Sequence, residues 1–189
     1  MSALTKTQAI QDVLGLATGR PVIFTTGYSA RIGASLGDRP LDFYMTGSMG
    51  LALSVGIGVA YATRRTTIVI DGDGSLLMNP VGLTSLGLHK DLPLIHVVLD
   101  DGQYASTGGQ PTQAHVADFC GWARGAGIES VVSAADRAAL TRAIPAPGEE
   151  PRAPRFVHCR VDSDEEKPPG RVSQPLPDHA RRFAGAVAV

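Results

Sequence analysis

Apolar positions along the chain alternate between short β-branched runs and longer stretches with helical spacing. The short runs predict strands at 22–25, 41–44, 68–70, 94–99, 131–132 and 156–161. Helical spacing predicts helices that begin near residues 9, 79, 115, 134 and 178, with a short helix inside 27–37. Because strands alternate with helices, we expect an α/β fold with a doubly wound, mainly parallel sheet and helices on both faces.

The stretch 49–62 differs from the other helical segments because it is apolar almost all round and rich in Gly and Ala. Such a helix is expected to be buried and to pack closely against its surroundings. The segments 145–154 and 164–177 are rich in proline and predict a flexible connection and an extended surface arm. Asp178 is placed to cap a last helix through Val187. We expect a single domain over 1–189, with 164–189 as a C-terminal arm and helix.

The composition excludes some classes of function but indicates none. The chain has 189 residues, 43% of them hydrophobic, and a formal net charge of −1, so neither nucleic-acid nor membrane binding is indicated. Cys120 and Cys159 have no metal-site or redox spacing and are expected to be buried free thiols. Polar residues interrupt the apolar positions near the N-terminus, so no signal peptide is predicted and a cytoplasmic location is expected.

Carboxylates follow two of the predicted strands directly. The sequence Asp71-Gly72-Asp73-Gly74-Ser75 follows the strand 68–70, and Asp100-Asp101 follows the strand 94–99. Ligands of open α/β sheets bind at the carboxyl ends of strands, and Mg²⁺ takes carboxylate and phosphate oxygens there. The glycines allow a tight turn and close approach of a ligand, and a helix N-terminus offers free N–H groups to phosphate.

Other kinds of segment share part of this pattern. A Gly-Asp-Gly sequence is often only a turn. A calcium-binding loop would need Gly at its sixth position and Glu at its twelfth, where this chain has Leu76 and Gly82. No phosphate-binding loop ending in Gly-Lys-Ser/Thr is present, and no complete Gly-x-Gly-x-x-Gly opens a helix.

Three ordered motifs resemble a known family. They are Gly72-Asp73-Gly74 followed after 26 residues by Asp101, the block Gly47-Ser48-Met49-Gly50, and the segment 104–112, which reads Tyr-Ala-Ser-Thr-Gly-Gly-Gln-Pro-Thr. Together they resemble the diphosphate-binding half of phosphonopyruvate and sulfopyruvate decarboxylases, which depend on thiamine diphosphate. The resemblance covers about residues 21–160.

The resemblance implies a role for each matching residue. Metal ligands would be the side chains of Asp73 and Asp101 and the backbone carbonyl of Gln103, with Mg²⁺ as the ion. The cofactor would be held by Thr26, Gly27, Tyr28, Gly47, Ser48, Met49, Gly74, Ser75 and Tyr104. Gly74 and Ser75 would contact the diphosphate, the Gly47 carbonyl would accept from the aminopyrimidine, and Met49 would lie between the two rings. Ordinary core packing is the alternative for Met49.

Two departures from the family pattern stand out. Asp101 replaces the usual Asn, which adds a negative charge near a diphosphate. At ~4 Å and an effective dielectric constant of ~20, one such repulsion is on the order of 4 kcal/mol before the metal compensates it. In addition, Ile32 follows Arg31 where these decarboxylases often have Glu.

The family activates its cofactor with a Glu from a separate pyrimidine-binding domain, and this chain has no room for that domain. The resemblance therefore implies a β subunit whose partner, the pyrimidine-binding α subunit, supplies the Glu, in a hetero-oligomer with two or more copies of each chain. The substrate would be a small anionic 2-oxo acid, 3-sulfopyruvate or 3-phosphonopyruvate, converted to an aldehyde and CO₂.

Candidates for holding the substrate's acidic group are Arg31, Thr107, Gln110 and His115, although Arg31 also fits a solvated charge and His115 the start of a helix. Two other functions remain open. One is a subunit of another thiamine diphosphate enzyme, a carboligase or an oxidoreductase. The other is a degenerate binding module without activity, for which Asp101 is the main support.

Overall fold

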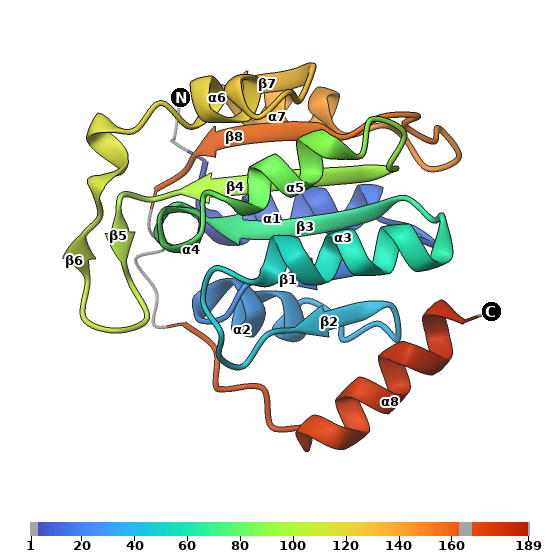
Figure 1. Cartoon of the computed structure of the whole chain (residues 1–189). Coiled ribbons are helices and arrows are strands. Elements are labelled where there is room, and N and C mark those ends of the chain that lie inside the picture. The colour runs from blue at the N-terminus through green and yellow to red at the C-terminus, as the bar shows by residue number, and fades with distance from the viewer. Residues whose placement is uncertain (1–3, 163–167, 189) are drawn as a thin grey trace.

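A six-stranded parallel sheet forms the centre of the molecule. The computed structural model describes residues 4–162 and 168–188 (Figure 1). The strand order is β2-β1-β3-β4-β8-β7, and every neighbouring pair runs parallel. The strands are β1 Val22–Phe24, β2 Asp42–Tyr44, β3 Thr67–Gly72, β4 Leu94–Asp100, β7 Ser130–Ala134 and β8 Arg155–Arg160. The α/β fold with a mainly parallel sheet is therefore confirmed.

Helices cover both faces of this sheet, as predicted. On one face lie α1 Lys6–Leu16, α2 Tyr28–Ser35 and α7 Arg137–Ala143. On the other lie α3 Ala52–Thr63, α4 Asp73–Met78, α5 Gly82–Leu88 and α6 Phe119–Gly125 (Figure 1). The last helix, α8 Leu176–Val187, packs beside the edge strand β2.

Side chains of each central strand alternate between two hydrophobic cores. In β3, Ile68 and Ile70 face the core under α1, α2 and α7, whereas Val69 faces the core under α3 and α5. In β4, Ile95 and Val97 repeat the pattern. Strands buried on both faces read as continuous apolar runs, which explains why the sequence predicted them well.

Two predicted helices differ from their prediction. The helix expected from residue 79 is α5, which begins only at Gly82, and a separate helix that was not predicted, α4, precedes it across a break that contains Pro80. The helix expected from residue 115 is a short 3₁₀ turn, η1 Gln113–Val116, and then α6, whose N-cap Asp118 accepts from the Gly121 N–H. A hairpin of β5 Gln103–Tyr104 and β6 Gln110–Pro111 was not predicted, because strands of two residues leave no hydrophobic alternation.

The expectation that 49–62 is a buried helix is wrong in two respects. Helix α3 starts only at Ala52, since the residues before it form a turn in which Ser48 and Gly50 have positive φ angles. Its inner face, with Leu53 and Gly56, is buried on the sheet. Its outer face, with Tyr61, is exposed, because no described part of the chain covers it.

The C-terminal helix also differs in detail from its prediction. It begins at Leu176, with Pro175 at the N-cap position, and Asp178 lies in its first turn rather than at the cap. Residues 164–167 of the predicted arm lie outside the described residues. Cys120 and Cys159 are buried free thiols, as predicted. Within the described residues no helix has the length and apolar character needed to cross a membrane.

Candidate thiamine diphosphate site

The candidate site lies where the strand order reverses. Strand β2 follows β1 on one side, and β3 then returns to pair with β1 on the other, so the loops after β1 and β3 diverge at the carboxyl end of the sheet. A small cavity of about 40 Å³ opens there. Nine of the twelve residues predicted to bind cofactor or metal line it: Thr26, Tyr28, Met49, Asp73, Gly74, Ser75, Asp101, Gln103 and Tyr104.

Asp73 is the first residue of α4 and directly follows β3. Its carboxylate therefore lies both at the carboxyl end of a strand and at the N-terminus of a helix. The side chain is buried, and its Oδ2 accepts a hydrogen bond of 2.5 Å from the Thr112 hydroxyl. Burial, together with the charges of Asp100 and Asp101, raises the pKa of Asp73 to about 6, although the Thr112 hydrogen bond opposes this shift. Asp73 is therefore a desolvated carboxylate beside two others, an arrangement that a cation would stabilise.

Asp100 and Asp101 point to different partners. Asp100 accepts from the Gly102 N–H at 3.1 Å and lies 2.9 Å from His158 Nε2 on β8. Burial alone would raise the pKa of Asp100, but the hydrogen bond and charge of His158 and the Gly102 N–H outweigh it, so the pKa is lowered. Asp100 thus joins β4 to β8, and Asp101 is the carboxylate left to face the cavity.

The Asp101 carboxylate has one paired and one unpaired oxygen. Its Oδ2 accepts from Lys6 Nζ at 2.7 Å, whereas its Oδ1 is buried and has no hydrogen-bond partner among the described residues. An unpaired buried carboxylate oxygen is unfavourable, and a cation would satisfy it. No three His, Cys, Asp or Glu side chains within the described ranges gather as a metal site. The two carboxylates therefore fit Mg²⁺ only together with other oxygen atoms, such as a backbone carbonyl and a diphosphate.

Ser75 links three segments that lie far apart in the sequence. Its hydroxyl oxygen accepts from the Thr25 hydroxyl at 2.9 Å and from the Gly50 N–H at 3.1 Å. Asn79 then donates to the Gly50 carbonyl at 2.9 Å. The end of β1, the 47–50 turn and α4 are thereby fixed to one another. Gly47 and Ser48 are exposed at the outer side of this turn and do not line the cavity.

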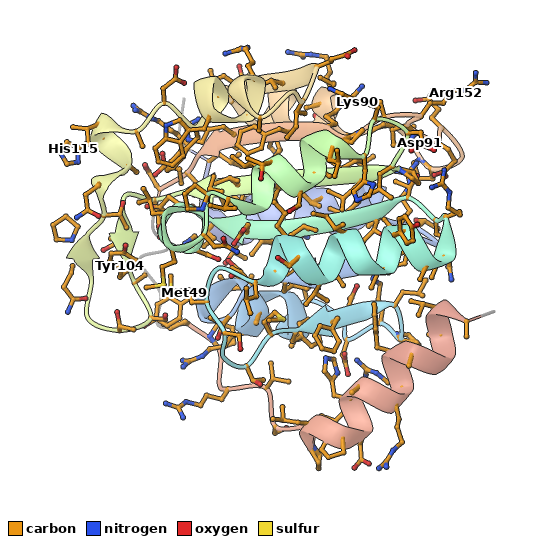
Figure 2. All side chains as sticks on the ribbon, in the orientation of Figure 1. Met49, Lys90, Asp91, Tyr104, His115 and Arg152 are labelled. Carbon is orange, nitrogen blue, oxygen red and sulfur yellow. The ribbon has the colours of Figure 1, made fainter. Side chains whose placement is uncertain are left out.

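The aromatic ring of Tyr104 lies directly against Gly74. A methyl group on Gly74 would come within 2.4 Å of the Tyr104 ring and 3.3 Å of Met49 Cε. Gly27, with a φ of 97°, likewise leaves room for Ser106, whose hydroxyl would lie 2.8 Å from an added Cβ. Figure 2 shows Met49 and Tyr104 at the carboxyl end of the sheet. The glycines therefore let the 103–106 segment close over α4 and the β1 loop.

The four substrate candidates do not gather at this cavity. The Arg31 guanidinium lies 5.3 Å from the centre of the Tyr28 ring and lines a separate depression with residues 169–174. Thr107 and Gln110 are exposed in the β5–β6 hairpin, with 3.4 Å between the Thr107 hydroxyl and Gln110 Oε1. His115 lines a neighbouring depression together with Asp101 (Figure 2). Their roles remain predictions.

The site also contains residues that sequence reasoning did not assign. Thr112 belongs to the quoted 104–112 motif, but only the fold brings its hydroxyl to Asp73. Thr25 ends the first predicted strand, and nothing in the sequence indicates its contact with Ser75. Lys6 is 95 residues from Asp101 and belongs to no motif, so no sequence signal could have identified it.

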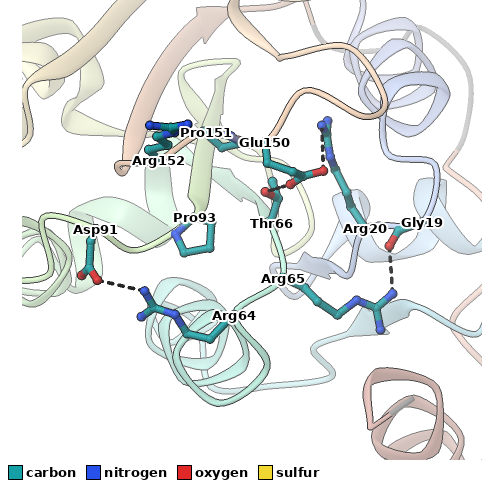
Figure 3. A pocket seen from close by; sticks show the side chains of 10 residues that line it. All are labelled: Gly19, Arg20, Arg64, Arg65, Thr66, Asp91, Pro93, Glu150, Pro151 and Arg152. Carbon is teal, nitrogen blue, oxygen red and sulfur yellow. Dashed lines mark hydrogen bonds and ion pairs between the residues drawn. The ribbon is translucent and has the colours of Figure 1, made fainter.

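A larger depression of about 740 Å³ lies at the amino end of the sheet, where the chain enters β3 and β4 (Figure 3). It is rich in arginine, but most of these side chains have structural partners. Arg64 pairs with Asp91 at 2.8 Å, and Arg65 donates to the Gly19 carbonyl at 2.9 Å. Arg20 donates to carbonyls of the 145–149 segment. No predicted site residue lines this depression.

Comparison with known proteins identifies the family of this chain. The family model described as "Thiamine pyrophosphate enzyme, C-terminal TPP binding domain" matches residues 25–159. The chain therefore belongs to the thiamine pyrophosphate enzymes and carries their C-terminal cofactor-binding domain. Thiamine pyrophosphate is the thiamine diphosphate of the motif analysis, so the predicted cofactor and family are confirmed.

Two curated relatives narrow the comparison. Sulfopyruvate decarboxylase subunit beta of Methanothermobacter thermautotrophicus is 37% identical over 175 residues, which are 93% of this chain and 88% of that subunit. Phosphonopyruvate decarboxylase of Streptomyces viridochromogenes is 36% identical over 184 residues, 97% of this chain. The chain spans only 46% of that second protein.

Solved structures support the fold. Thiamine diphosphate-dependent 4-hydroxybenzoylformate decarboxylase of Rhodococcus jostii RHA1 superposes with a TM-score of 0.71 and 21% identity, over 88% of this chain and 34% of that one. A thiamin diphosphate-dependent enzyme isolated from Mycobacterium smegmatis gives a TM-score of 0.68 at 18% identity, over 85% of this chain and 32% of that one.

Proposed function

We propose that this chain is the diphosphate-binding subunit of a two-subunit decarboxylase that acts on 3-sulfopyruvate or 3-phosphonopyruvate and depends on thiamine diphosphate and Mg²⁺. The observation that carries the proposal is the match along nearly its whole length to a sulfopyruvate decarboxylase β subunit. The pair Asp73 and Asp101, with the unpaired Oδ1 of Asp101, supports the metal dependence.

The residues of this chain would bind and orient rather than react. Asp73, Asp101 and the Gln103 carbonyl would hold Mg²⁺, and Gly74 and Ser75 at the start of α4 would contact the diphosphate. Met49 would lie between the two rings of the cofactor. The chemistry supplied by bound thiamine diphosphate is a nucleophilic carbon and an electron sink for the loss of CO₂ from a 2-oxo acid.

The activating Glu is expected from a partner chain. The glutamates that the structure describes here, Glu129, Glu149 and Glu150, lie outside the cavity at the carboxyl end of the sheet. A pyrimidine-binding α subunit would therefore complete the site, in a hetero-oligomer with two or more copies of each chain. The sulfonate or phosphonate of the substrate would be held by Arg31, Thr107, Gln110 or His115 or by groups of the partner.

Co-expression with a partner encoded beside this chain tests the proposal. The purified complex should release CO₂ from 3-sulfopyruvate or 3-phosphonopyruvate only when thiamine diphosphate and Mg²⁺ are both present. The chain alone, verified free of partner by mass spectrometry, should be inactive. Decarboxylation by the isolated chain would contradict the shared site. A complex that binds the cofactor without decarboxylating either substrate would favour a carboligase or an oxidoreductase, and one that binds no cofactor would favour a degenerate module.

A further inference from the structure

Asp101 brings a negative charge to a position where the family that this chain resembles usually has a neutral Asn. The carboxylate is part of a buried ion pair: Lys6 Nζ donates to Asp101 Oδ2 at 2.7 Å, and the two side chains are 9% and 2% exposed. Solvent therefore screens neither charge effectively, and each depends on the other.

The position of Lys6 is fixed by backbone contacts rather than by its own side chain. Thr5 and Gln8 form a capping box at the start of α1. The Lys6 N–H donates to the Asp162 carbonyl at 3.1 Å, and the Asp162 N–H donates to the Leu4 carbonyl at 2.8 Å. These bonds attach the first turn of α1 to the chain just after β8, at the carboxyl edge of the sheet where Asp101 lies.

A lysine at this place needs a compensating interaction. A cation in the first turn of a helix opposes the helix dipole, and a buried ammonium loses its hydration. Among the described residues, Asp101 is the only carboxylate recorded in an ion pair with Lys6. The pair is therefore a local arrangement in which two unfavourable charges neutralise each other.

The ion pair with Lys6 also makes the two carboxylate oxygens of Asp101 differ in their contacts. Oδ2 is taken by Lys6, whereas Oδ1 is buried without a hydrogen-bond partner among the described residues. An asparagine in the same place would offer one carbonyl oxygen and no net charge. Lys6 and Asp101 together offer the same: one free oxygen and a net charge of zero.

We propose that Lys6 is a positioning residue of the metal and diphosphate site, and that Lys6 and Asp101 together replace the single Asn of the family. Lys6 neutralises the additional charge that would repel a diphosphate and holds the carboxylate so that Oδ1 is free for the cation. The inference rests on the proposed function, because it assumes that this site binds Mg²⁺ and thiamine diphosphate.

Two single variants and the double variant test this inference in the complex with the partner. Lys6→Met should leave a carboxylate without its counter-charge and weaken thiamine diphosphate binding at saturating Mg²⁺ by tenfold or more. Adding Asp101→Asn to Lys6→Met should return the affinity to within about threefold of wild type, because charge neutrality and one free oxygen are restored. Calorimetry with thiamine diphosphate measures both effects without any turnover.

Stability of the cofactor-free chain is the second measurement. Lys6→Met and Asp101→Asn should each lower the melting temperature by about 5 °C or more, since each leaves one buried charge unpaired. The double variant should melt close to wild type. Arg137→Met is the matched control, because it removes a second ion pair of α1, with Asp12 at 2.6 Å, far from the cavity. Its cofactor affinity should equal that of wild type.

The outcomes separate this inference from the function on which it rests. Wild-type complex that binds no thiamine diphosphate would overturn both. Wild-type complex that binds it, with Lys6→Met binding equally well, would overturn the role of Lys6 and leave the proposed function intact. The same holds if Lys6→Met weakens binding and Asp101→Asn fails to restore it, since Lys6 would then act only through the fold.

Discussion

At the scale of single residues, the site is defined by where each carboxylate finds its partner. Asp100 is held by His158, Asp101 by Lys6, and Asp73 by the hydroxyl of Thr112. Three acidic side chains close together are unfavourable, and the chain distributes them among a histidine, a lysine and a neutral donor. Burial raises the pKa of Asp73, which has no cationic partner among the described residues, to about 6.

Asp73→Asn should therefore stabilise the metal-free chain at neutral pH. Between pH 3.8 and 6 the folded chain retains a proton on Asp73 that the unfolded chain releases, so stability falls as the pH rises through this window. A pKa of about 6 against 3.8 corresponds to about 3 kcal/mol of unfolding free energy that Asn would recover above pH 6. Urea denaturation at pH 4, 5 and 7 measures this difference, and the variant should also lose Mg²⁺-dependent cofactor binding.

Asp100→Asn provides the control of opposite sign. The pKa of Asp100 is lowered in the folded chain, so its carboxylate stabilises the fold above the ordinary pKa and this stability is lost on acidification. Asn at this position should destabilise the chain at pH 7. If both variants shifted stability in the same direction at pH 7, the description of Asp73 as a desolvated carboxylate without a cationic partner in the described chain would be incorrect.

At the scale of elements, the sequence predicted the fully buried strands well. It predicted poorly those elements whose position depends only on tertiary packing. The continuous apolar runs 68–70 and 94–99 lie within β3 and β4, because strands covered on both faces admit few polar residues. The break between α4 and α5 and the two-residue strands of the hairpin have no periodicity to detect. The 47–50 turn and the 72–75 segment were found from motif spacing, whereas Lys6 depends on tertiary contacts that no local pattern records.

Two glycines of α3 should respond in opposite ways to the same substitution. A methyl group on Gly56 would lie 2.2 Å from Val69 Cγ2 on β3, whereas nothing lies within 4 Å of one on Gly58. Gly56→Ala should cost about 1–3 kcal/mol of unfolding free energy through overpacking. Gly58→Ala should add about 0.5–1 kcal/mol through helix propensity. Urea unfolding of both variants tests the contact between α3 and the sheet, and equal effects would rule out that contact.

Helix α8 should detach from β2 as the pH falls. His179 Nε2 accepts from the Tyr44 N–H at 2.9 Å, which requires the neutral imidazole. Burial lowers the pKa of His179 below 6.5, Arg182 lowers it further, and Asp38 and Asp42 oppose the shift. The unfolded chain therefore takes up this proton first, so the stability that neutral His179 provides is complete above pH 6.5 and is lost below it.

His179→Gln tests this assignment, because the amide oxygen can still accept from Tyr44 and does not titrate. Hydrogen exchange of the Tyr44 amide should accelerate in the wild type between pH 7.5 and 5.5, relative to the intrinsic rate, and should do so less in the variant. Equal pH dependence in the two proteins would assign the effect to another group.

At the scale of the whole molecule, one face lacks a cover within the described chain. Helices α3, α4 and α5 lie on the same side of the sheet (Figure 1). Their outer surface exposes large apolar side chains, namely Tyr61, Met78, Val81 and Leu88. Exposed apolar groups gathered on one face are typical of protein interfaces, and Met78 ends the helix that begins with Asp73. We therefore expect the proposed partner to cover this face as it completes the cofactor site.

Val81→Asp combined with Leu88→Lys should separate partner binding from folding. Val81 and Leu88 are 67% and 76% exposed at the N-terminal and C-terminal ends of α5. The helix dipole favours a negative charge at the first position and a positive charge at the second. The melting temperature of the isolated chain should stay within about 2 °C of wild type, since exposed substitutions change unfolding free energy by about 0.5 kcal/mol or less. Co-purification with the partner should fall at least tenfold, because two charges would have to be desolvated in the interface.

Leu176→Asp, on α8 and 57% exposed, is the matched control and should leave the complex intact. A double variant that assembles like wild type would assign the partner to a different surface of this chain.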